Sequence, residues 1–380
     1  MKMPTRHEIP ALLTSLQNRN PASPPAASRK HIILYGAGGL GTMAAQFFQH
    51  VGEHVSFAMD KNANPHMLEK YSIPVFAEAK PADHTDKILL VSTLSEPYSQ
   101  IAAELQSRGW QTIYPFYDYA HNYKHRHPLN NGWFCGNLSS EDIAGISGVT
   151  EILEDRHSVG AYLQCIAWRL LREDWLFAEA PVIPENRYFI PQVANLLSDT
   201  ERFLDIGAYD GRVLLKLLNL NRNKIESAVM IEPDAINMGL LQKTVRALPL
   251  QLQEKITLLS FVVSDRNGQT SFSQGFGFAS RECEIASSRL PSATLDDLVL
   301  SSTFIKIHTE GNELAVLHGA KKTLIHQRPM IVVTLYHSRD GLWKIPAYLI
   351  SLLDEYAFYF RGHSWCGTGA VFYAIPRGRN

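Results

Sequence analysis

The chain has 380 residues, of which 45% are hydrophobic and 19% are charged, and its formal net charge is -1. This length suits two domains with sizeable cores, and the small net charge without a run of lysine or arginine argues against nucleic acid as a partner. No stretch approaches the roughly 20 apolar residues of a membrane span, and the first residues lack an apolar signal core, so we expect a cytoplasmic protein without membrane contact.

Residues 1–28 predict a short helix, from Ile9 to Gln17, followed by the sequence NPASPPAAS. Prolines and small residues bury little surface and favour extended chain. We therefore expect a flexible N-terminal segment that ends in a linker.

A strand, a glycine turn and a helix come next. HIILY runs into GAGGLG, which places Gly36, Gly38 and Gly41 at the G-x-G-x-x-G positions, and the following strand ends at Asp60, where a ribose-binding acid is expected. Residues 29–120 thus predict a Rossmann-like domain, which either binds a nucleotide or serves only for packing and recruitment. The segment resembles the N-terminal nucleotide-sugar-binding unit of bacterial sugar-modifying enzymes, and this resemblance implies sugar-related chemistry.

Residues 121–182 have a helical composition. Apolar side chains recur at spacings of three and four at Val159, Leu163, Ile166 and Leu170, as on one face of an amphipathic helix. We interpret this part as a helical connector between two domains.

In the last part, residues 183–380, the first candidate ligand-binding motif is FLDIGAYDGR, which again predicts a strand, a glycine turn and a helix. The next two predicted strands are SAVMIEPDA, which ends at Glu232 and Pro233, and ITLLSFVVS, which ends at Ser264 and Asp265. Because the carboxyl ends of parallel strands meet at one edge of a sheet, Glu232 is expected close to the glycine turn, where its carboxylate can accept two ribose hydroxyls.

These motifs and their order resemble the FkbM-type S-adenosylmethionine-dependent methyltransferases. The resemblance rests on DIGAYDG, on IEP, on TLDDL followed by IKIHTEGNELAVLHGA, and on LYHSRDGLWKIPAYL followed by YFRGH, with RYF as a lead-in. It covers about Ile183 to Pro376 and implies a Rossmann-like, seven-stranded methyltransferase domain. The predicted fold is therefore α/β, with two Rossmann-like domains joined by a helical segment.

The resemblance also implies S-adenosylmethionine as cofactor and a hydroxyl of a sugar or a natural product as methyl acceptor. By position it implies cofactor contacts at Asp205, Gly207, Ala208, Tyr209, Asp210, Gly211, Glu232, Pro233, Ser264 and Asp265. The segment from His308 to Glu313 would face the reacting methyl group.

One departure from the family pattern lies in that segment. The family usually has I-K-x-D-x-E-G, whereas His308 stands here at the position of the aspartate. An imidazole has an unperturbed pKa of about 6.5 and can act as a general base at neutral pH. Strand alternation would place Glu310 on the same face, and His337 ends the next strand, so these three residues are the catalytic candidates. Since imidazole disfavours Mg²⁺, we expect no metal.

Two alternatives remain open at this point. The histidine and the altered end of the glycine loop, Arg212 and Val213, also suit a catalytically weakened scaffold that keeps its cofactor site. A nicotinamide-dependent oxidoreductase built on the N-terminal glycines is disfavoured, because no Tyr-x-x-x-Lys set follows them. The expected partner is a small-molecule or saccharide acceptor, and the sequence leaves a homo-oligomer open.

Overall fold

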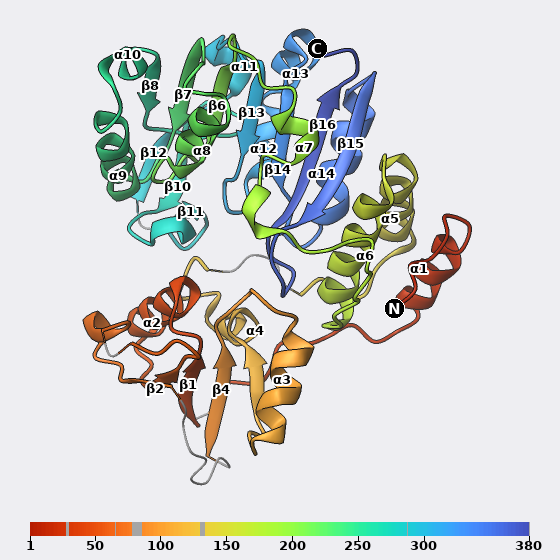
Figure 1. Ribbon diagram of the computed structural model, residues 1–380, viewed down its shortest axis with the longest axis vertical. Coiled ribbons are helices and arrows are strands. Elements are labelled where there is room, and N and C mark those ends of the chain that lie inside the picture. The colour runs from red at the N-terminus through yellow and green to blue at the C-terminus, as the bar shows by residue number, and fades with distance from the viewer. Residues whose placement is uncertain (28–29, 65, 78–85, 130–133, 287, 380) are drawn as a thin grey trace.

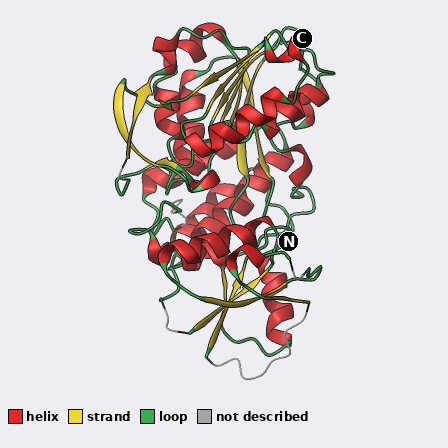
Figure 2. Cartoon of the chain, turned by 90° about the vertical axis from the view of Figure 1, so that its left-hand side faces the viewer, coloured by secondary structure: helices red, strands yellow, loops and turns green. Residues whose placement is uncertain are grey.

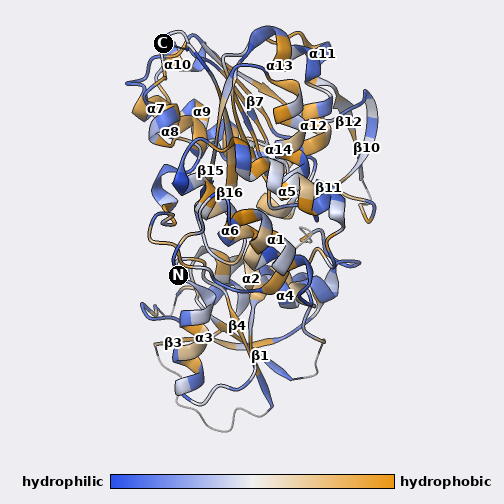
Figure 3. Ribbon diagram, turned by 90° about the vertical axis from the view of Figure 1, so that its right-hand side faces the viewer, coloured by the Kyte–Doolittle hydropathy of each residue, from blue (hydrophilic) through white to orange (hydrophobic). Residues whose placement is uncertain are grey.

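Two mainly parallel sheets, each flanked by helices, organise the chain (Figure 1). The computed structural model describes residues 1–27, 30–64, 66–77, 86–129, 134–286 and 288–379. Figure 3 shows the apolar strands of both sheets enclosed between helices. The predicted fold class, with two Rossmann-like α/β units, is confirmed.

The N-terminal sheet has five parallel strands in the order β3-β2-β1-β4-β5. Four of the five residues of β1 are buried, as expected for a strand that is covered on both faces. The strands are β1 (His31–Tyr35), β2 (Val55–Met59), β3 (Val75–Phe76), β4 (Lys87–Val91) and β5 (Ile113–Pro115). The helices of this part are α2 (Gly39–Val51), α3 (Tyr98–Ser107) and α4 (Phe116–Ala120), with the 3-10 turns η1 (Glu69–Tyr71) and η2 (His121–Tyr123).

The C-terminal sheet has seven strands in the order β15-β16-β14-β13-β6-β7-β8, and β16 alone runs antiparallel to its neighbours. This confirms the predicted seven-stranded domain. The strands are β6 (Arg202–Ile206), β7 (Ser227–Ile231), β8 (Ile256–Leu259), β13 (Phe304–Ile307), β14 (Met330–Thr334), β15 (Tyr356–Gly362) and β16 (Ala370–Pro376).

The two faces of this sheet belong to different cores. On β6, Phe203 packs with the core that contains α8 and α9, whereas Leu204 and Ile206 pack with the core that contains α12 and α14. This alternation also fixes the face of every neighbouring side chain. The helices of this part are α7 (Pro191–Ala194), α8 (Arg212–Leu220), α9 (Ala235–Arg246), α10 (Leu250–Gln253), α11 (Leu295–Leu298), α12 (Glu313–His318), α13 (Lys321–Gln327) and α14 (Gly341–Leu352).

A small third sheet, in the order β11-β10-β12-β9, lies beside the main one (Figure 2). Its strands are β9 (Val262–Val263), β10 (Gly268–Ser273), β11 (Arg281–Glu282) and β12 (Ser288–Ala293), and the turn η4 (Gly277–Ala279) precedes β11. The sequence predicted one continuous strand over residues 256–264. Instead, β8 ends at Leu259 and the chain enters the small sheet through β9.

Residues 1–27 differ from the expected flexible segment. The helix α1 (Ile9–Gln17) has the predicted bounds, but Ile9, Leu13 and Leu16 are buried and pack in the same core as α5 (Ser140–Ile152). The three- and four-residue spacing of these apolar side chains is typical of a helix that packs through one face. Of the predicted linker, Ser28 lies outside the described residues.

The helices of the connector lie against the C-terminal unit. The helix α6 (Arg156–Leu171) packs on β15, and Arg172, at its end, pairs with Asp118 of α4 at 2.8 Å. The helix thus contacts both units, and the turn η3 (Pro184–Asn186) follows it. In the part of the chain that the structure describes, no helix is long and apolar enough to cross a bilayer.

Candidate active site

The glycine turn after β6 is packed directly against the end of β13. Gly207 has a φ of +78°, and a Cβ there would lie 1.9 Å from the carbonyl oxygen of His308. Gly211 has a φ of +82° and begins α8. Any side chain at Gly207 would push the two strand ends apart, so glycine is required by close approach as well as by conformation.

Glu232 holds this turn in place from the end of β7. Its Oε2 accepts a hydrogen bond from the backbone N–H of Tyr209 (2.8 Å), and its Oε1 accepts one from the N–H of Asp234 (3.0 Å). Burial raises the pKa of this carboxyl, and the two hydrogen bonds act in the opposite direction. A carboxylate accepts about four hydrogen bonds in total, so Glu232 keeps capacity for a ligand.

The N-terminus of α9 holds the loop between β10 and β11 close to the glycine turn. Asp234 caps α9 and also accepts from the N–H of Gly275 (2.5 Å) and from the hydroxyl of Ser280 (2.7 Å). Asn237 donates to the carbonyl of Gly277 at 2.9 Å. These hydrogen bonds hold residues 275–280, the covering loop, over the strand ends.

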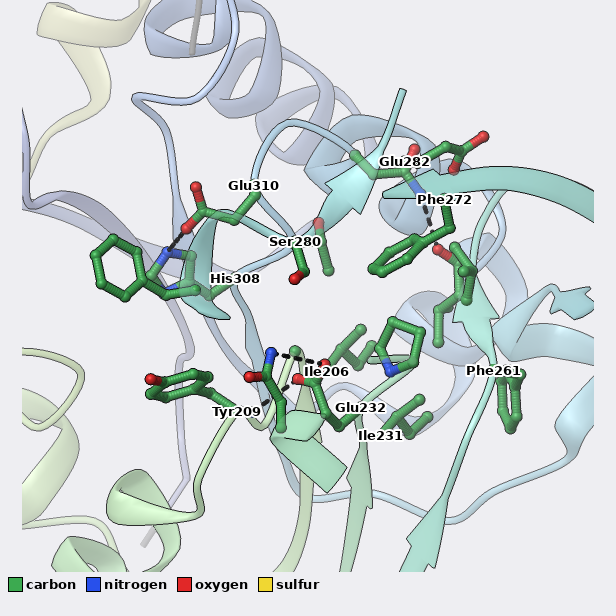
Figure 4. A pocket seen from close by; sticks show the side chains of 18 of the residues that line it. Ile206, Tyr209, Ile231, Glu232, Phe261, Phe272, Ser280, Glu282, His308 and Glu310 are labelled. Atoms are coloured by element: carbon green, nitrogen blue, oxygen red, sulfur yellow. Dashed lines mark hydrogen bonds and ion pairs between the residues drawn. The ribbon is translucent and has the colours of Figure 1, made fainter. Parts of the chain in front are cut away.

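A cavity of about 600 Å³ lies between this covering loop and the strand ends (Figure 4). Glu232, Asn237 and Ser280 are among its polar residues. Its walls are otherwise largely apolar and are formed by Ile206, Ile231, Pro233, Phe261, Val262, Val263, Phe272 and Phe278. A pocket whose apolar wall is combined with several converging polar groups is typical of a small-molecule site.

Four of the predicted cofactor residues line this cavity. They are Gly207, Tyr209, Glu232 and Pro233. Ala208, Asp210 and Gly211 belong to the turn but lie outside the lining. Ala208 is buried, Asp210 pairs with the side chain of Arg212, and Gly211 packs toward Leu241.

Asp205 lies away from the cavity. Its side chain is on the opposite face of β6 from Ile206, fully buried, with its Oδ1 2.8 Å from Nζ of Lys306 on β13. Burial raises the pKa of Asp205, and the charge of Lys306 opposes that shift. The ammonium of Lys306 also donates to the carbonyl of Gly207 at 2.6 Å. Asp205 therefore supports the turn through a buried ion pair.

Ser264 and Asp265 also lie outside the cavity. The chain leaves the main sheet after Leu259, so Phe261, Val262 and Val263 take the lining positions that the sequence assigned to Ser264 and Asp265. Ser264 is buried beside Gly319, and Asp265 is exposed.

The three predicted catalytic residues meet at one point. His308 Nε2 lies 2.9 Å from Glu310 Oε1, His337 Nε2 lies 3.3 Å from the same oxygen, and the two imidazole rings stack with centroids 4.8 Å apart. The cause is not strand alternation, because β13 ends at Ile307 and Glu310 adopts a φ of +56°. A turn thus brings Glu310 back toward His308.

The two histidines have opposite charge states. Burial lowers the pKa of His308 to about 3, so its ring is neutral at pH 7. Burial also acts against a charged His337, but the flanking carboxylates of Glu310 and Glu313 hold its pKa well above the usual value. Because Glu310 only accepts, Nε2 of His308 carries the proton and Nδ1 accepts from the hydroxyl of Tyr188 at 2.7 Å.

A second cavity, of about 790 Å³, adjoins the first. Both are lined by Tyr209, Phe278, His308 and Glu310. The rest of its lining comes from residues before α5, from the loop before α7, from the start of α8, from the loop after β14 and from the loop between β15 and β16. These residues are Leu94, Tyr117, Leu129, Arg187, Arg212, Tyr336, His337, Ser364, Thr368 and Gly369. His308 and Glu310 thus stand at the junction of two spaces.

The N-terminal glycine motif has a related construction. Asp60 accepts from the N–H of Ala37 at 2.8 Å, as Glu232 does from Tyr209, and Gly36 and Asp60 line a cavity of about 620 Å³. Gly38 and Gly41 do not line it, and a Cβ on Gly41 would lie 2.2 Å from the carbonyl oxygen of Gly36. Nucleotide binding there stays a prediction.

Sequence reasoning missed several residues of the site. Asn237 follows the Glu232 motif by five residues on α9, and a helix N-terminus beside a strand-end acid was a signal for it. Tyr188 lies within the lead-in motif RYF and contacts His308. Phe272 and Phe278 reach the cavity only through the small sheet, and no sequence pattern announced that placement.

The seven-stranded sheet, in which β16 alone is antiparallel, carries a glycine turn after its central strand β6 and an acid at the end of the next strand, and this arrangement is consistent with a Rossmann-like methyltransferase fold. Residues 205–360 match the model of the methyltransferase FkbM domain family. No curated protein sequence matches the chain significantly.

A solved structure with the same fold spans nearly the whole chain. Methyltransferase FkbM from Methylobacillus flagellatus KT is 18% identical, with a TM-score of 0.65 over 98% of this chain and 100% of its own. Two further structures match about half of the chain. M. capricolum TrmK with S-adenosyl-homocysteine is 15% identical, with a TM-score of 0.28 over 50% of this chain and 67% of its own. Precorrin-6y C5,15-methyltransferase from Geobacter metallireducens GS-15 is also 15% identical, with a TM-score of 0.31 over 51% and 93%.

Proposed function

We propose that the chain is an S-adenosylmethionine-dependent methyltransferase that methylates a hydroxyl group of a sugar or of a related natural product. One observation carries the proposal: Glu232 faces an apolar cavity at the glycine turn, and this cavity shares His308 and Glu310 with a second one. The first space suits a cofactor and the second suits an acceptor. The FkbM family match supports the methyltransferase class.

The residues of the first cavity fit an adenosyl group. Glu232 is placed to accept the ribose hydroxyls, since its carboxylate is fixed by two backbone N–H groups and points at the cavity. The aromatic and aliphatic wall formed by Phe261, Val263 and Phe272 suits the flat face of adenine. Neither Asp205, Ser264 nor Asp265 takes part in this assignment.

When bound, S-adenosylmethionine supplies a methyl group on a sulfonium; its transfer to an acceptor oxygen leaves the neutral thioether and releases the hydroxyl proton. The protein aligns the two partners, since Tyr209, His308 and Glu310 border both cavities. Glu310 accepts the proton of the hydroxyl, because its carboxylate lines both cavities, and the Nε2–H of His308 holds that carboxylate in place.

The second cavity has the chemistry of a saccharide site. Its walls combine the aromatic rings of Tyr117 and Tyr336 with the hydroxyls of Ser364 and Thr368, and Arg187 adds a cation. Aromatic rings pack on the apolar faces of sugars, while hydroxyls and guanidinium groups bind their oxygen atoms. Part of this wall comes from the N-terminal unit, which gives that unit a role in holding the acceptor.

A methyl-transfer screen tests the proposal. The full-length protein is incubated with S-adenosylmethionine and a panel of saccharides, nucleotide-sugars and amines, and product masses are read directly. We expect a gain of one methylene unit on a hydroxylated acceptor, located on oxygen by fragmentation. Methylation confined to amines would contradict the proposed acceptor.

A variant of Glu310 tests the reaction centre within that screen. Glu310→Gln keeps the shape of the side chain but removes its charge, so turnover should fall about 100-fold while cofactor affinity changes little. Unchanged turnover would exclude Glu310 from proton uptake.

A further inference from the structure

The side chains at the junction of the two cavities have the composition of a metal site. His308, Glu310 and His337 each offer one ligand atom, and these atoms all lie within 4.8 Å of one another. Two imidazoles and one carboxylate from two adjacent strand ends converge there.

The distances between the atoms fit a single ion. Metal–nitrogen and metal–oxygen bonds to zinc are about 2.1 Å long, so two ligand atoms on one ion lie about 3.0–3.4 Å apart in common geometries. Glu310 Oε1 lies 2.9 Å from Nε2 of His308 and 3.3 Å from Nε2 of His337. The remaining pair, the two imidazole nitrogens, lies within 4.8 Å and needs to close by at most about 1.8 Å.

The second nitrogen of each imidazole, Nδ1, already has a polar partner. Nδ1 of His337 lies 2.7 Å from Oε1 of Glu313, and Nδ1 of His308 lies 2.7 Å from the hydroxyl of Tyr188. Metal-binding histidines are oriented in this way, with one nitrogen on a carboxylate or another polar group and the other on the ion. Both Nε2 atoms therefore face the shared point at Glu310.

A buried nitrogen that has an ion pair but no hydrogen bond marks the same point. Nε2 of His337 is inaccessible to solvent and forms no hydrogen bond with any described residue, although it lies 3.3 Å from Glu310. A buried polar nitrogen without a hydrogen bond is costly and calls for an explanation such as an ion.

We propose that His308, Glu310 and His337 bind one divalent transition-metal ion, with Tyr188 and Glu313 as positioning residues. This differs from the sequence-based expectation of no metal, which considered only Mg²⁺. Nitrogen-rich ligand sets favour Zn²⁺, Co²⁺, Ni²⁺ or Fe²⁺ instead. On binding, His337 releases its Nε2 proton to solvent, and the Nε2 proton of His308 moves to its Nδ1, where the hydroxyl of Tyr188 turns to accept it. The charge of the ion balances the carboxylates of Glu310 and Glu313.

Three protein ligands leave coordination positions open toward the cavities that His308 and Glu310 line. An acceptor oxygen in such a position would lose its proton more readily, because a bound cation stabilises the alkoxide. This consequence rests on the proposed function, whereas metal binding itself does not.

Cobalt titration of the full-length, chelator-treated protein tests the site. Co²⁺ alone is added, and its visible absorption reports coordination by nitrogen and oxygen, with Zn²⁺ then used to displace it. We expect one ion per chain and an affinity at least about 100-fold weaker in His337→Ala. The matched control is His66→Ala, since His66 and Glu69 form an exposed histidine–carboxylate pair at 3.0 Å.

A second variant guards against misfolding of His337→Ala. Glu313→Gln keeps all three ligands and removes the negative charge behind His337, so cobalt affinity should fall about 10–100-fold and the spectrum should shift. Thermal unfolding checks the turn that Glu313 also holds through the N–H groups of Thr309 and Gly311. Absence of stoichiometric cobalt binding to the folded wild type overturns the proposal, as does full affinity in both variants. Binding of S-adenosylmethionine is measured separately, so that failure of either proposal is recognised independently.

Discussion

Removal of the buried ammonium beneath the glycine turn should destabilise the C-terminal unit severely. Lys306 and Asp205 face each other on adjacent strands, 2.8 Å apart, with side chains only 2% and 0% exposed. Lys306→Met keeps the aliphatic length but leaves the Asp205 carboxylate buried without its cation.

The expected loss is about 3–5 kcal/mol of unfolding free energy, the range for breaking one partner of a buried pair. The variant also loses the hydrogen bond from Nζ to the carbonyl of Gly207. In the double variant Asp205→Leu/Lys306→Met, no charge is left buried, so most of the loss should be recovered. Urea unfolding, followed by far-UV circular dichroism, measures all three proteins.

The matched control is an exposed pair of the same length. Lys224 and Asp199 also lie 2.8 Å apart, but their side chains are 57% and 64% exposed. Lys224→Met should therefore cost less than about 1 kcal/mol. A loss in Lys306→Met no larger than in this control would refute the reasoning.

Three further variants probe the turn, the unused acid and a buried histidine. Gly207→Ala should lower the stability and abolish cofactor binding, because its Cβ would lie 1.9 Å from a carbonyl oxygen; Gly239→Ala, with no atom within 4 Å, should be tolerated in both assays. Asp205→Asn should leave the affinity for S-adenosylmethionine within about threefold, a factor worth less than about 1 kcal/mol; a loss of 100-fold would restore Asp205 as a cofactor ligand. His363 donates to the carbonyl of Ile183 and accepts from the hydroxyl of Tyr373, and burial holds its pKa at about 4. Since the unfolded imidazole titrates at about 6.5, this contribution is complete above pH 6.5 and is lost as the pH falls toward 4, by up to about 3 kcal/mol. His363→Gln should flatten that part of the stability profile, and an unchanged slope in chemical unfolding would contradict the assignment.

The sequence predicted the parts of the site that depend on local backbone geometry. A glycine turn after a buried strand and an acid at the end of the next strand are fixed by parallel-sheet topology, so the sequence places Gly207 and Glu232 at one sheet edge, and both line the first cavity. Four motifs in order also predicted the family of residues 205–360.

The predicted cofactor residues that lie outside the first cavity owe their positions to tertiary structure. Asp205 has the expected position in the motif, but the strand register pairs it with Lys306. No local sequence pattern indicates this ion pair between residues about 100 positions apart. Ser264 and Asp265 were placed on one strand that in fact divides between two sheets. The meeting of Glu310 with both histidines required a residue with positive φ, which the sequence does not reveal for a glutamate.

Calorimetric titration of S-adenosylmethionine, with NADH titrated in parallel, tests the central claim most directly. The wild type should bind one S-adenosylmethionine per chain, Glu232→Gln should bind it about 10–100-fold more weakly through loss of charged hydrogen bonds, and Asp265→Asn should bind it normally. Thermal unfolding of each variant confirms that its fold is intact. Binding of NADH alone, or equal affinity in the wild type and in Glu232→Gln, would contradict the account.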